Sequence, residues 1–290
     1  MKKISRRSFL AAAGMTAAAC MLSACGGSSS SSSSSSAAGS SAASSSAAGQ
    51  TIFSLDDLAG KTVGVQLGTT GDIYISDEVG NTEGLNLAEC KQYNKGGDAV
   101  QALLAGQIDA VVIDDQVAVK FVEANADKLT ILETEYAVED YAAAIAKDNA
   151  ALTEQFNQAI AALKANGTLE AILDKYINKT EGAAGYVTPE GTEYPNGKLV
   201  MGTNATFEPY EYIEGGEITG IDAEFAKAIC DMLGYELEIQ DMEFDSLIVA
   251  VQGHKVDFAM AGMTVTEERL QYIDFTDSYC TGVQVVIVAK

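Results

Sequence analysis

The sequence predicts an α/β protein built from two similar lobes. Residues 99–113 and 245–260 follow the same plan, in which an apolar helix ends at a glycine and a continuous apolar strand follows. Helices that end at glycine and strands that are apolar throughout are typical of parallel α/β units. Hydrophobic residues make up 47% of the 290 residues, which is enough to bury a core in each lobe. We therefore expect two α/β lobes with a central cleft.

The first of these lobes is expected over residues 51–140. A strand over 61–67 leads through Gly68, which allows a close backbone approach, into a helix over 73–79. The repeated helix–glycine–strand unit then supplies a second buried strand over 110–113. This succession predicts a parallel sheet covered by helices.

A hinge crossing and a helical pair are expected over 141–180, with the pair packed on the other lobe. Apolar residues recur at helical spacing over 152–163, and Thr168 can cap a second helix. These apolar stripes predict core packing and no function. Residues 181–197 are rich in glycine, contain two of the three prolines and lack an apolar period, so they predict a linker.

The other lobe is expected over 198–290. A strand over 198–202 opens it, and a helix over 221–233 follows. Residues 236–240 alternate like a strand with one exposed face, and residues 256–260 predict a buried strand. Strands that alternate with helices in this way predict a second parallel α/β unit.

Residues 1–24 predict a signal peptide rather than part of the fold. Basic residues precede an apolar run over 9–22, which is too short for a stable membrane span. Leu22-Ser23-Ala24-Cys25 matches a bacterial lipobox, so we expect Cys25 to be lipidated and to become the mature N-terminus. Cys20 is a weaker alternative site. A pair of arginines in the same segment also resembles a twin-arginine export signal, and ordinary secretion is the alternative.

Residues 25–50 are almost entirely serine, alanine and glycine. Such a segment cannot bury apolar surface, so it predicts a flexible tether. Together with the lipobox, the tether predicts a domain that is held at the outer face of the bacterial cytoplasmic membrane and is free to reorient there.

The chain is strongly acidic, with a formal charge of −23 at pH 7. Removing residues 1–24 takes away four of the 18 basic residues and none of the 41 acidic ones, which leaves −27. Nucleic acid and anionic lipid surfaces are poor partners for a protein of this charge, so we expect no nucleic-acid partner.

Cysteine and histidine usage argues against a metal centre. Cys90, Cys230 and Cys280 are odd in number and their spacing matches no metal motif. One disulfide could form in this compartment, but we expect small buried residues. His254 is the single histidine, which excludes a histidine-based zinc site or a Ser-His-Asp triad. We expect a monomer with no metal and no cofactor.

Two strand-to-helix corners predict a site for a small anion. The corner over 261–269 follows a buried strand, presents free backbone N–H groups and two hydroxyls, and leads into a helix that starts at Arg269. A guanidinium can hold a carboxylate with two parallel hydrogen bonds. The second corner follows Gly68, where two threonines can cap the helix and donate hydroxyls. Each corner alone is also compatible with an ordinary capped helix, but two of them indicate a carboxylate held between two lobes.

Several motifs resemble those of the solute-binding protein family 3 of ABC importers, the polar amino-acid receptors. The resemblance covers nearly all of residues 51–290 and rests on segments 65–70, 202–212, 220–222, 244–248, 261–269 and 273–279. It implies a type II periplasmic-binding-protein-like fold. It also implies that the chain binds an α-amino acid and delivers it to the membrane permease subunits of an ABC importer.

The two blocks stand in an exchanged order relative to that family. Family members begin with the equivalent of 198–290 and continue into the equivalent of 51–180, so the sequence resembles a circular permutation in which 181–197 join the old ends. A truncated tandem array is the alternative. In this family two strands cross between the lobes. We expect the break after Lys290 to sever one crossing and to leave the other, near 138–146, as the single covalent hinge.

The resemblance also assigns roles to individual residues. Arg269 is expected to pair with the carboxylate of the amino acid, and Asp114 matches the acidic position that holds its ammonium, with Asp115 as the fallback. A desolvated ammonium–carboxylate contact discriminates strongly against analogues that lack the group. Further donors to the ligand are expected from Thr264, from the backbone around Ala261 and Gly262, and from Thr69 and Thr70.

Two aromatic residues match positions that flank the ligand side chain in the family. Phe207 and Phe244 would each contribute about 1 kcal/mol beyond burial, and plain core packing is the alternative for Phe244. Asn204 stands where some basic-amino-acid receptors carry an aspartate. This indicates a weaker preference for lysine or arginine, unless Glu208 or Asp72 compensates.

The predicted function is extracytoplasmic binding of an α-amino acid, with a closure of the lobes that the permease recognises. An enzyme on the same fold, similar to a cyclohexadienyl dehydratase, is one alternative. It would need a positioned acid or base in the cleft, and no pair of carboxylates stands out for that role. A sensor module that binds an amino acid and acts on a signalling partner is the other alternative.

Overall fold

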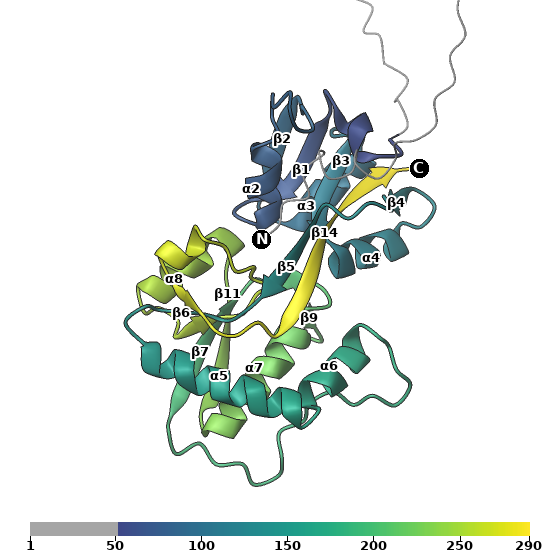
Figure 1. Ribbon diagram of the computed structural model, residues 1–290. Helices are drawn as coiled ribbons and strands as arrows, with labels where there is room; N and C mark the ends of the chain where they lie inside the picture. The colour runs from purple at the N-terminus through teal and green to yellow at the C-terminus, as the bar shows by residue number, and fades with distance from the viewer. Residues whose placement is uncertain (1–51) are drawn as a thin grey trace, which may run out of the picture. The chain divides into compact units, whose positions relative to one another are not determined.

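Two larger β-sheets and a small one organise residues 52–290, the part of the chain that the computed structural model describes (Figure 1). We name the two main lobes the β1 lobe and the β7 lobe, after a strand inside each larger sheet. The predicted two-lobed α/β architecture is confirmed. The predicted signal peptide, the whole predicted tether and the predicted lipidation site Cys25 lie outside the described residues.

The β1 lobe contains a mixed sheet in the order β2-β1-β3-β14-β4, and β5 also pairs with β14. β1 is parallel to β2 and β3, whereas β14 is antiparallel to each of its partners. The strands are β1 (Thr62–Gln66), β2 (Glu89–Tyr93), β3 (Ala110–Asp114), β4 (Leu129–Ile131), β5 (Ala137–Tyr141) and β14 (Cys280–Ala289). The helices of this lobe are η1 (Leu55–Leu58), α2 (Thr70–Ser76), α3 (Gly96–Leu104) and α4 (Asp115–Ala124).

Helix α2 begins three residues before the predicted start at residue 73. Thr69 is its N-cap, with a side chain that accepts a hydrogen bond from the backbone N–H of Asp72. This bond satisfies one of the free donors of the first turn, so the helix starts directly at the corner. Only the three-residue turn 67–69 therefore separates the carboxyl end of β1 from the first turn of α2.

The β7 lobe contains a five-stranded sheet in the order β11-β7-β12-β6-β13, with β7 parallel to β11 and β12. Its strands are β6 (Ala144–Ile145), β7 (Lys198–Thr203), β11 (Glu236–Asp241), β12 (Phe258–Ala259) and β13 (Asp274–Phe275). A small antiparallel sheet consists of β8 (Thr206–Phe207), β9 (Glu211–Glu214) and β10 (Glu217–Thr219). The helices are α5 (Ala150–Ala165), α6 (Thr168–Tyr176), α7 (Ile221–Leu233), η2 (Phe244–Ser246), α8 (Leu247–Gln252) and η3 (Arg269–Gln271). Helices α5 and α6 both pack on α7.

The helix predicted to start at Arg269 is absent, and only the short 3-10 turn η3 follows the corner. The chain must turn at once, because β13 pairs with β6 only a few residues later. Arg269 is consequently held by this turn, in which the backbone N–H of Ile273 donates to the Arg269 carbonyl oxygen at 3.0 Å. The corner offers side chains and a few backbone donors rather than the N-terminus of a long helix.

Two chain segments cross between the lobes, so the predicted single hinge is wrong. β5 leaves the β1 lobe toward β6, and β14 enters the β1 lobe after β13, with the two strands paired antiparallel over their shared length (Figure 1). β14 continues past the crossing and becomes an interior strand between β3 and β4. The range 198–290 expected for one lobe therefore extends too far, because its last strand belongs to the other sheet.

Gly282 is required for this crossing ribbon. A Cβ atom at Gly282 would come within 2.0 Å of the Tyr141 hydroxyl oxygen, because the tyrosine ring lies directly over the glycine. The Tyr141 hydroxyl donates from there to a carboxylate oxygen of Asp114 at the end of β3. The ribbon thus positions an acidic side chain at the edge of the cleft.

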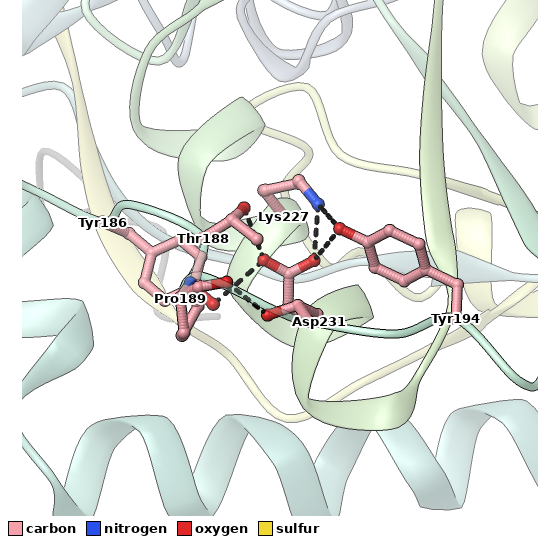
Figure 2. A network of polar contacts seen from close by, with 7 residues as sticks. Tyr186, Thr188, Pro189, Tyr194, Lys227 and Asp231 are labelled. Carbon is pink, nitrogen blue, oxygen red and sulfur yellow. Dashed lines mark hydrogen bonds and ion pairs between the residues drawn. The ribbon is translucent and has the colours of Figure 1, made fainter.

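The segment predicted as a linker, 181–197, is docked on α7. Figure 2 shows Tyr186, Thr188 and Tyr194 of this segment around the carboxylate of Asp231 on α7, with Lys227 one turn away. The hydroxyls donate to Asp231 at 3.0, 2.7 and 3.2 Å, respectively. We call residues 186–194 the strap. It joins α6 to β7 along a fixed path.

Apolar side chains form one large cluster that includes α5, α6 and α7, and two smaller clusters in the two lobes. Among residues 52–290, no helix is long and apolar enough to span a bilayer. In the same residues, Cys90, Cys230 and Cys280 are unpaired. No cluster of three or more metal-ligating side chains was found in the described residues. His254 faces Asp148 at the surface, at 3.1 Å.

Candidate ligand-binding site

A narrow cavity between the β1 lobe and the β7 lobe is lined by side chains from both. Every ligand-binding residue predicted from the sequence lies in its wall. The β1 lobe contributes Thr69, Thr70 and Asp114, and the β7 lobe contributes Asn204, Phe207, Phe244, Ala261, Gly262, Thr264 and Arg269. Two further residues, Gln66 and Glu211, line the cavity and were not predicted.

Arg269 supplies the positive charge of the cavity. Its side chain is buried, and its guanidinium donates to the carbonyl oxygens of Thr264 at 2.7 Å and Gly68 at 2.9 Å. The guanidinium carbon lies 5.5 Å from the centroid of the Phe244 ring. Burial lowers the pKa of Arg269 from its usual value, and the nearby Glu139 carboxylate opposes this shift. Both acceptors of the guanidinium are neutral, so a ligand carboxylate would be a stronger partner.

The threonine corner of the β1 lobe is already hydrogen-bonded within the protein. The Thr69 hydroxyl donates to the Gln66 carbonyl oxygen at 2.7 Å and accepts from the Asp72 backbone N–H at 3.2 Å. The Thr70 hydroxyl donates to the Glu139 carboxylate at 2.9 Å. These bonds fix the positions of both hydroxyls at the cavity wall.

Asp114 supplies a negative charge to the same cavity. Asp114 is 5% exposed, and its carboxylate accepts the hydrogen bond that the Tyr141 hydroxyl donates. Burial, followed by the charge of Glu139, raises the pKa of Asp114 to about 7. Its neighbour Asp115 does not line the cavity, and its carboxylate accepts instead from the Gln116 amide at 2.8 Å and the Val283 backbone N–H at 3.4 Å. The geometry therefore distinguishes the two candidates in favour of Asp114.

Glu139 is a buried carboxylate that the sequence did not single out. One of its oxygens accepts hydrogen bonds from Thr70 at 2.9 Å, Thr264 at 2.8 Å and Gln284 at 3.0 Å. The other oxygen has no donor among the described residues. Glu139 lies on β5, so a residue of the crossing ribbon links the threonines of the two corners.

Glu211 is the second missed carboxylate, and it lines the cavity directly. It is 1% exposed, and no described N–H or O–H group donates to either of its oxygens. Burial, and then the charge of Asp222, raises the pKa of Glu211 well above its usual value. Asp222 itself accepts from the Gly262 backbone N–H and the Tyr279 hydroxyl, both at 2.8 Å. The raised pKa means that Glu211 keeps a proton, which it shares with Asp222, and a ligand cation beside it would favour the ionised carboxylate instead.

The aromatic walls come from Phe207 and Phe244. Phe207 is buried and packs on Tyr210 with ring centroids 5.9 Å apart. Gly262 has a positive φ of 53°, and a Cβ there would come within 3.0 Å of the Phe207 ring. The glycine thus lets the corner approach the aromatic wall closely.

Asn204 is held from three directions. Its amide donates to the Met242 carbonyl oxygen at 2.9 Å, and its oxygen accepts from Thr206 at 3.0 Å and from Gln66 at 2.9 Å. The acidic residues expected to compensate for Asn204 lie elsewhere. Glu208 forms an ion pair with Lys120 at 2.6 Å, and Asp72 accepts from the Gly68 backbone N–H at 2.9 Å. Glu211 is the acid that reaches the cavity instead.

Two protein-family models match the chain. A model of the bacterial extracellular solute-binding proteins of family 3 matches residues 199–290. A model of periplasmic substrate-binding proteins of ABC transporters, of the phosphonate type, matches residues 32–194. The second match covers more than half of the chain.

Characterised relatives are similar over part of their length. The arginine-binding extracellular protein ArtP of Bacillus subtilis is 46% identical over 34% of this chain and 39% of ArtP. A probable histidine-binding protein of Neisseria gonorrhoeae is 33% identical over 31% of this chain and 34% of its own length. The L-cystine-binding protein TcyJ of Escherichia coli is 32% identical over 44% of this chain and 46% of TcyJ. Each match thus spans less than half of the relative, and all three relatives are named as binding proteins.

Solved structures of similar sequence also match over short stretches. An ancestral arginine-binding protein bound to arginine is 44% identical, with a TM-score of 0.26 over 27% of this chain and 34% of that protein. The arginine-bound domain 1 of TmArgBP is 37% identical, with a TM-score of 0.29 over 33% of this chain and 82% of that domain.

Proposed function

Because this chain belongs to the periplasmic substrate-binding proteins of ABC transporters, we propose that it binds an α-amino acid between its lobes and delivers it to an importer. One observation carries this proposal. A single cavity contains a buried guanidinium and a buried carboxylate, Arg269 and Asp114, contributed by different lobes. That pair is complementary to the carboxylate and ammonium of a zwitterion.

The two ends of the zwitterion meet different groups. Arg269 takes the ligand carboxylate. Thr264, Thr69 and Thr70 lie in the same wall, and each donates to the ligand only by exchanging its present bond to Glu139 or to the Gln66 carbonyl oxygen. Asp114 takes the ammonium, and the Tyr141 hydroxyl keeps its carboxylate oriented toward the cavity. A phosphonate ligand fits less well, because the ionised form of Asp114 would place negative charge beside a second anion.

We further propose that the ligand side chain is cationic. Glu211 has two buried oxygens without a donor, and a guanidinium or ammonium would satisfy them. Phe207 and Phe244 flank the same cavity and favour a flat or apolar side-chain stem. The relatives named for arginine and histidine binding support this choice. The weaker preference expected from Asn204 is therefore offset by an acid on β9.

Delivery of the amino acid to the importer depends on closure of the two lobes. A ligand that contacts both lobes stabilises the arrangement in which they are shut, and the importer's membrane subunits recognise that arrangement. We propose that the protein acts as a monomer outside the cytoplasm, held at the membrane by a lipid on Cys25 through the serine-rich tether.

The exchanged order of the two blocks supports a circular permutation. Ile52 and Val288 belong to the same apolar cluster, so residues near both ends of the described chain meet in the β1 lobe. At the other join, the strap leads from α6 to β7 across α7. We propose that residues 51–180 and 198–290 form one binding unit whose blocks are permuted.

A back-permuted chain tests this order. The variant would carry 198–290 first, followed directly by 51–180, with 181–197 removed. The expected result is a folded protein that binds the same amino acid with an affinity within about threefold of the parent, because both lobes and both crossings are retained. An insoluble or non-binding variant, alongside a binding parent, would contradict the proposed order.

A thermal-shift screen tests the function. The twenty amino acids and methylphosphonate are added separately to the full chain, and arginine, lysine or histidine is expected to raise the melting temperature most. Stabilisation follows from binding to the folded state alone. Stabilisation by methylphosphonate and by no amino acid would overturn the proposal. Turnover of prephenate or arogenate would favour the enzyme alternative.

A further inference from the structure

The amides of Gln66 and Asn204 meet across the cleft. Gln66 ends β1 and Asn204 follows β7, so the two residues belong to different lobes, and they are 4% and 3% exposed. The Gln66 amide donates to the Asn204 oxygen at 2.9 Å. A hydrogen bond between two buried side chains of different lobes can exist only while the lobes are together.

Asn204 is oriented for this contact by its own lobe. Its amide nitrogen donates to the Met242 carbonyl oxygen at 2.9 Å, and the Thr206 hydroxyl donates to its oxygen at 3.0 Å. These bonds point the remaining lone pair of the Asn204 oxygen at the β1 lobe. The Asn204 oxygen is therefore occupied by protein groups, and one of its two amide hydrogens is bound to the Met242 carbonyl oxygen.

A second contact joins the lobes at the rim of the cleft. Lys120 on α4 forms an ion pair with Glu208, which follows β8, at 2.6 Å. Their side chains are 25% and 46% exposed, so salt screens this pair, unlike the buried amides.

We propose that Gln66–Asn204 and Lys120–Glu208 form a closure clasp that holds the lobes together over the ligand. The four residues are positioning residues: they act on the closed state and not through contacts with the amino acid. The inference rests on the proposed function, because it assigns the clasp to the binding cavity described above. Asn204 then affects the rate at which the ligand dissociates, whereas Glu211 recognises the side chain of the ligand.

A double-mutant cycle tests the buried half of the clasp. Gln66→Ala and Asn204→Ala are each expected to accelerate amino-acid dissociation about fivefold in stopped-flow measurements, the effect of losing one hydrogen bond. The double variant is expected to dissociate no faster than the faster single variant, because both substitutions remove the same contact. Effects that multiply in the double variant would show that each amide acts independently, and would overturn the clasp.

Charge exchange tests the rim half. Lys120→Glu and Glu208→Lys are each expected to accelerate dissociation about threefold at low salt, and the combined variant is expected to restore the parent rate. The difference should disappear at about 0.5 M NaCl, whereas the amide variants keep theirs. Lys198→Glu is the control, because Lys198 and Glu238 form a pair of similar exposure within the β7 lobe at 3.0 Å. Failure of the combined variant to recover would overturn the rim contact.

Small-angle X-ray scattering of the full chain separates this proposal from the proposed function. Without any amino acid, the clasp variants are expected to have a larger radius of gyration than the parent and the Lys198→Glu control. That result can be obtained even if the parent binds no amino acid, in which case only the proposed function fails. Equal radii for the parent and the clasp variants, with amino-acid binding retained, would overturn the clasp alone.

Discussion

Arg269 and Asp114 illustrate how two buried charges define the ligand. The Arg269 guanidinium donates to two neutral carbonyl oxygens and has no carboxylate within ion-pair distance among the described residues. A buried cation without a direct counter-charge is costly, and a ligand carboxylate would relieve that cost. Asp114 is buried beside Glu139, and the mutual repulsion of the two carboxylates favours an incoming ammonium.

Replacement of Arg269 tests the first of these charges. Arg269→Ala is expected to weaken amino-acid binding at least about a hundredfold, because the ligand carboxylate would be buried without a charged donor. Calorimetric titration measures the change. The melting temperature should fall little, since the guanidinium contacts two neutral carbonyl oxygens and the Phe244 ring and forms no ion pair among the described residues. An unchanged affinity would refute the assigned role.

Variants of Asp114 and of its neighbour Asp115 test the second charge, with the Asp115 variant as the control. Asp114→Asn is expected to weaken binding about a hundredfold, because the neutral amide cannot balance a buried ammonium. Asp115→Asn should change the affinity less than about threefold, since Asp115 lies outside the cavity wall. A larger loss from the Asp115 variant would move the ammonium site by one residue.

The raised pKa of Asp114 predicts a pH dependence. The ammonium needs the ionised carboxylate, so affinity should fall about tenfold per pH unit below the pKa of about 7, and binding at pH 6 should release a proton. In the absence of ligand, the effect of pH on folding stability has the opposite sign to its effect on affinity. The folded state keeps this proton between pH 3.8 and about 7, so stability from this group falls as pH rises through that range. Calorimetry in two buffers of different ionisation enthalpy measures the proton release, and Asp114→Asn should remove this contribution. Equal affinities at pH 5.5 and pH 8 would contradict the assignment.

At the scale of elements, polar contacts hold the strap in place, although its sequence has no periodic pattern of apolar residues that could pack on the core. The Asp231 side chain is 3% exposed and collects the hydroxyls of Tyr186, Thr188 and Tyr194 together with the Lys227 ammonium (Figure 2). Residues 181–197 lack the spacing of a helix or strand, so their path depends on polar contacts with α7, of which Asp231 makes the largest number, alongside the Glu224 carboxylate that accepts from the Tyr186 backbone N–H at 2.9 Å.

Removal of the anchor should destabilise the fold. Asp231→Ala is expected to lower the free energy of unfolding by about 3 kcal/mol, because several half-buried donors lose their charged acceptor at once. Urea denaturation measures the change. Asp174→Ala is the control, since Asp174 accepts one exposed bond from Asn178, and it should cost less than about 0.5 kcal/mol. A similar loss in both variants would show that the strap is not anchored at Asp231.

The parts of the site that could be predicted follow directly from local sequence. Asp114 and the threonine corner come immediately after apolar strands, where the carboxyl ends of parallel strands meet the cleft. Glu139 and Glu211 could not be predicted, because their burial results from the crossing ribbon and the small sheet meeting other segments. The membership of β14 in the β1-lobe sheet was missed for the same reason, since an apolar strand fits either sheet.

For the whole molecule, the two crossings and the clasp define how the lobes move. β5 and β14 are paired along the crossing, so both covalent connections bend together as one ribbon. The Arg269 guanidinium, the Gln66 amide and the Lys120 ammonium each reach across the cleft to the opposite lobe. Arg269 therefore serves both recognition and closure, whereas the clasp residues Gln66 and Lys120 serve closure.

The most direct measurement compares an amino acid with its decarboxylated amine by calorimetry. With arginine and agmatine as the pair, the parent protein is expected to bind arginine at least about a hundredfold more tightly, because agmatine has no carboxylate for Arg269. In Arg269→Ala that preference should vanish. Agmatine binding to the parent as tightly as arginine would contradict the central claim that the cavity recognises both charges of a zwitterion.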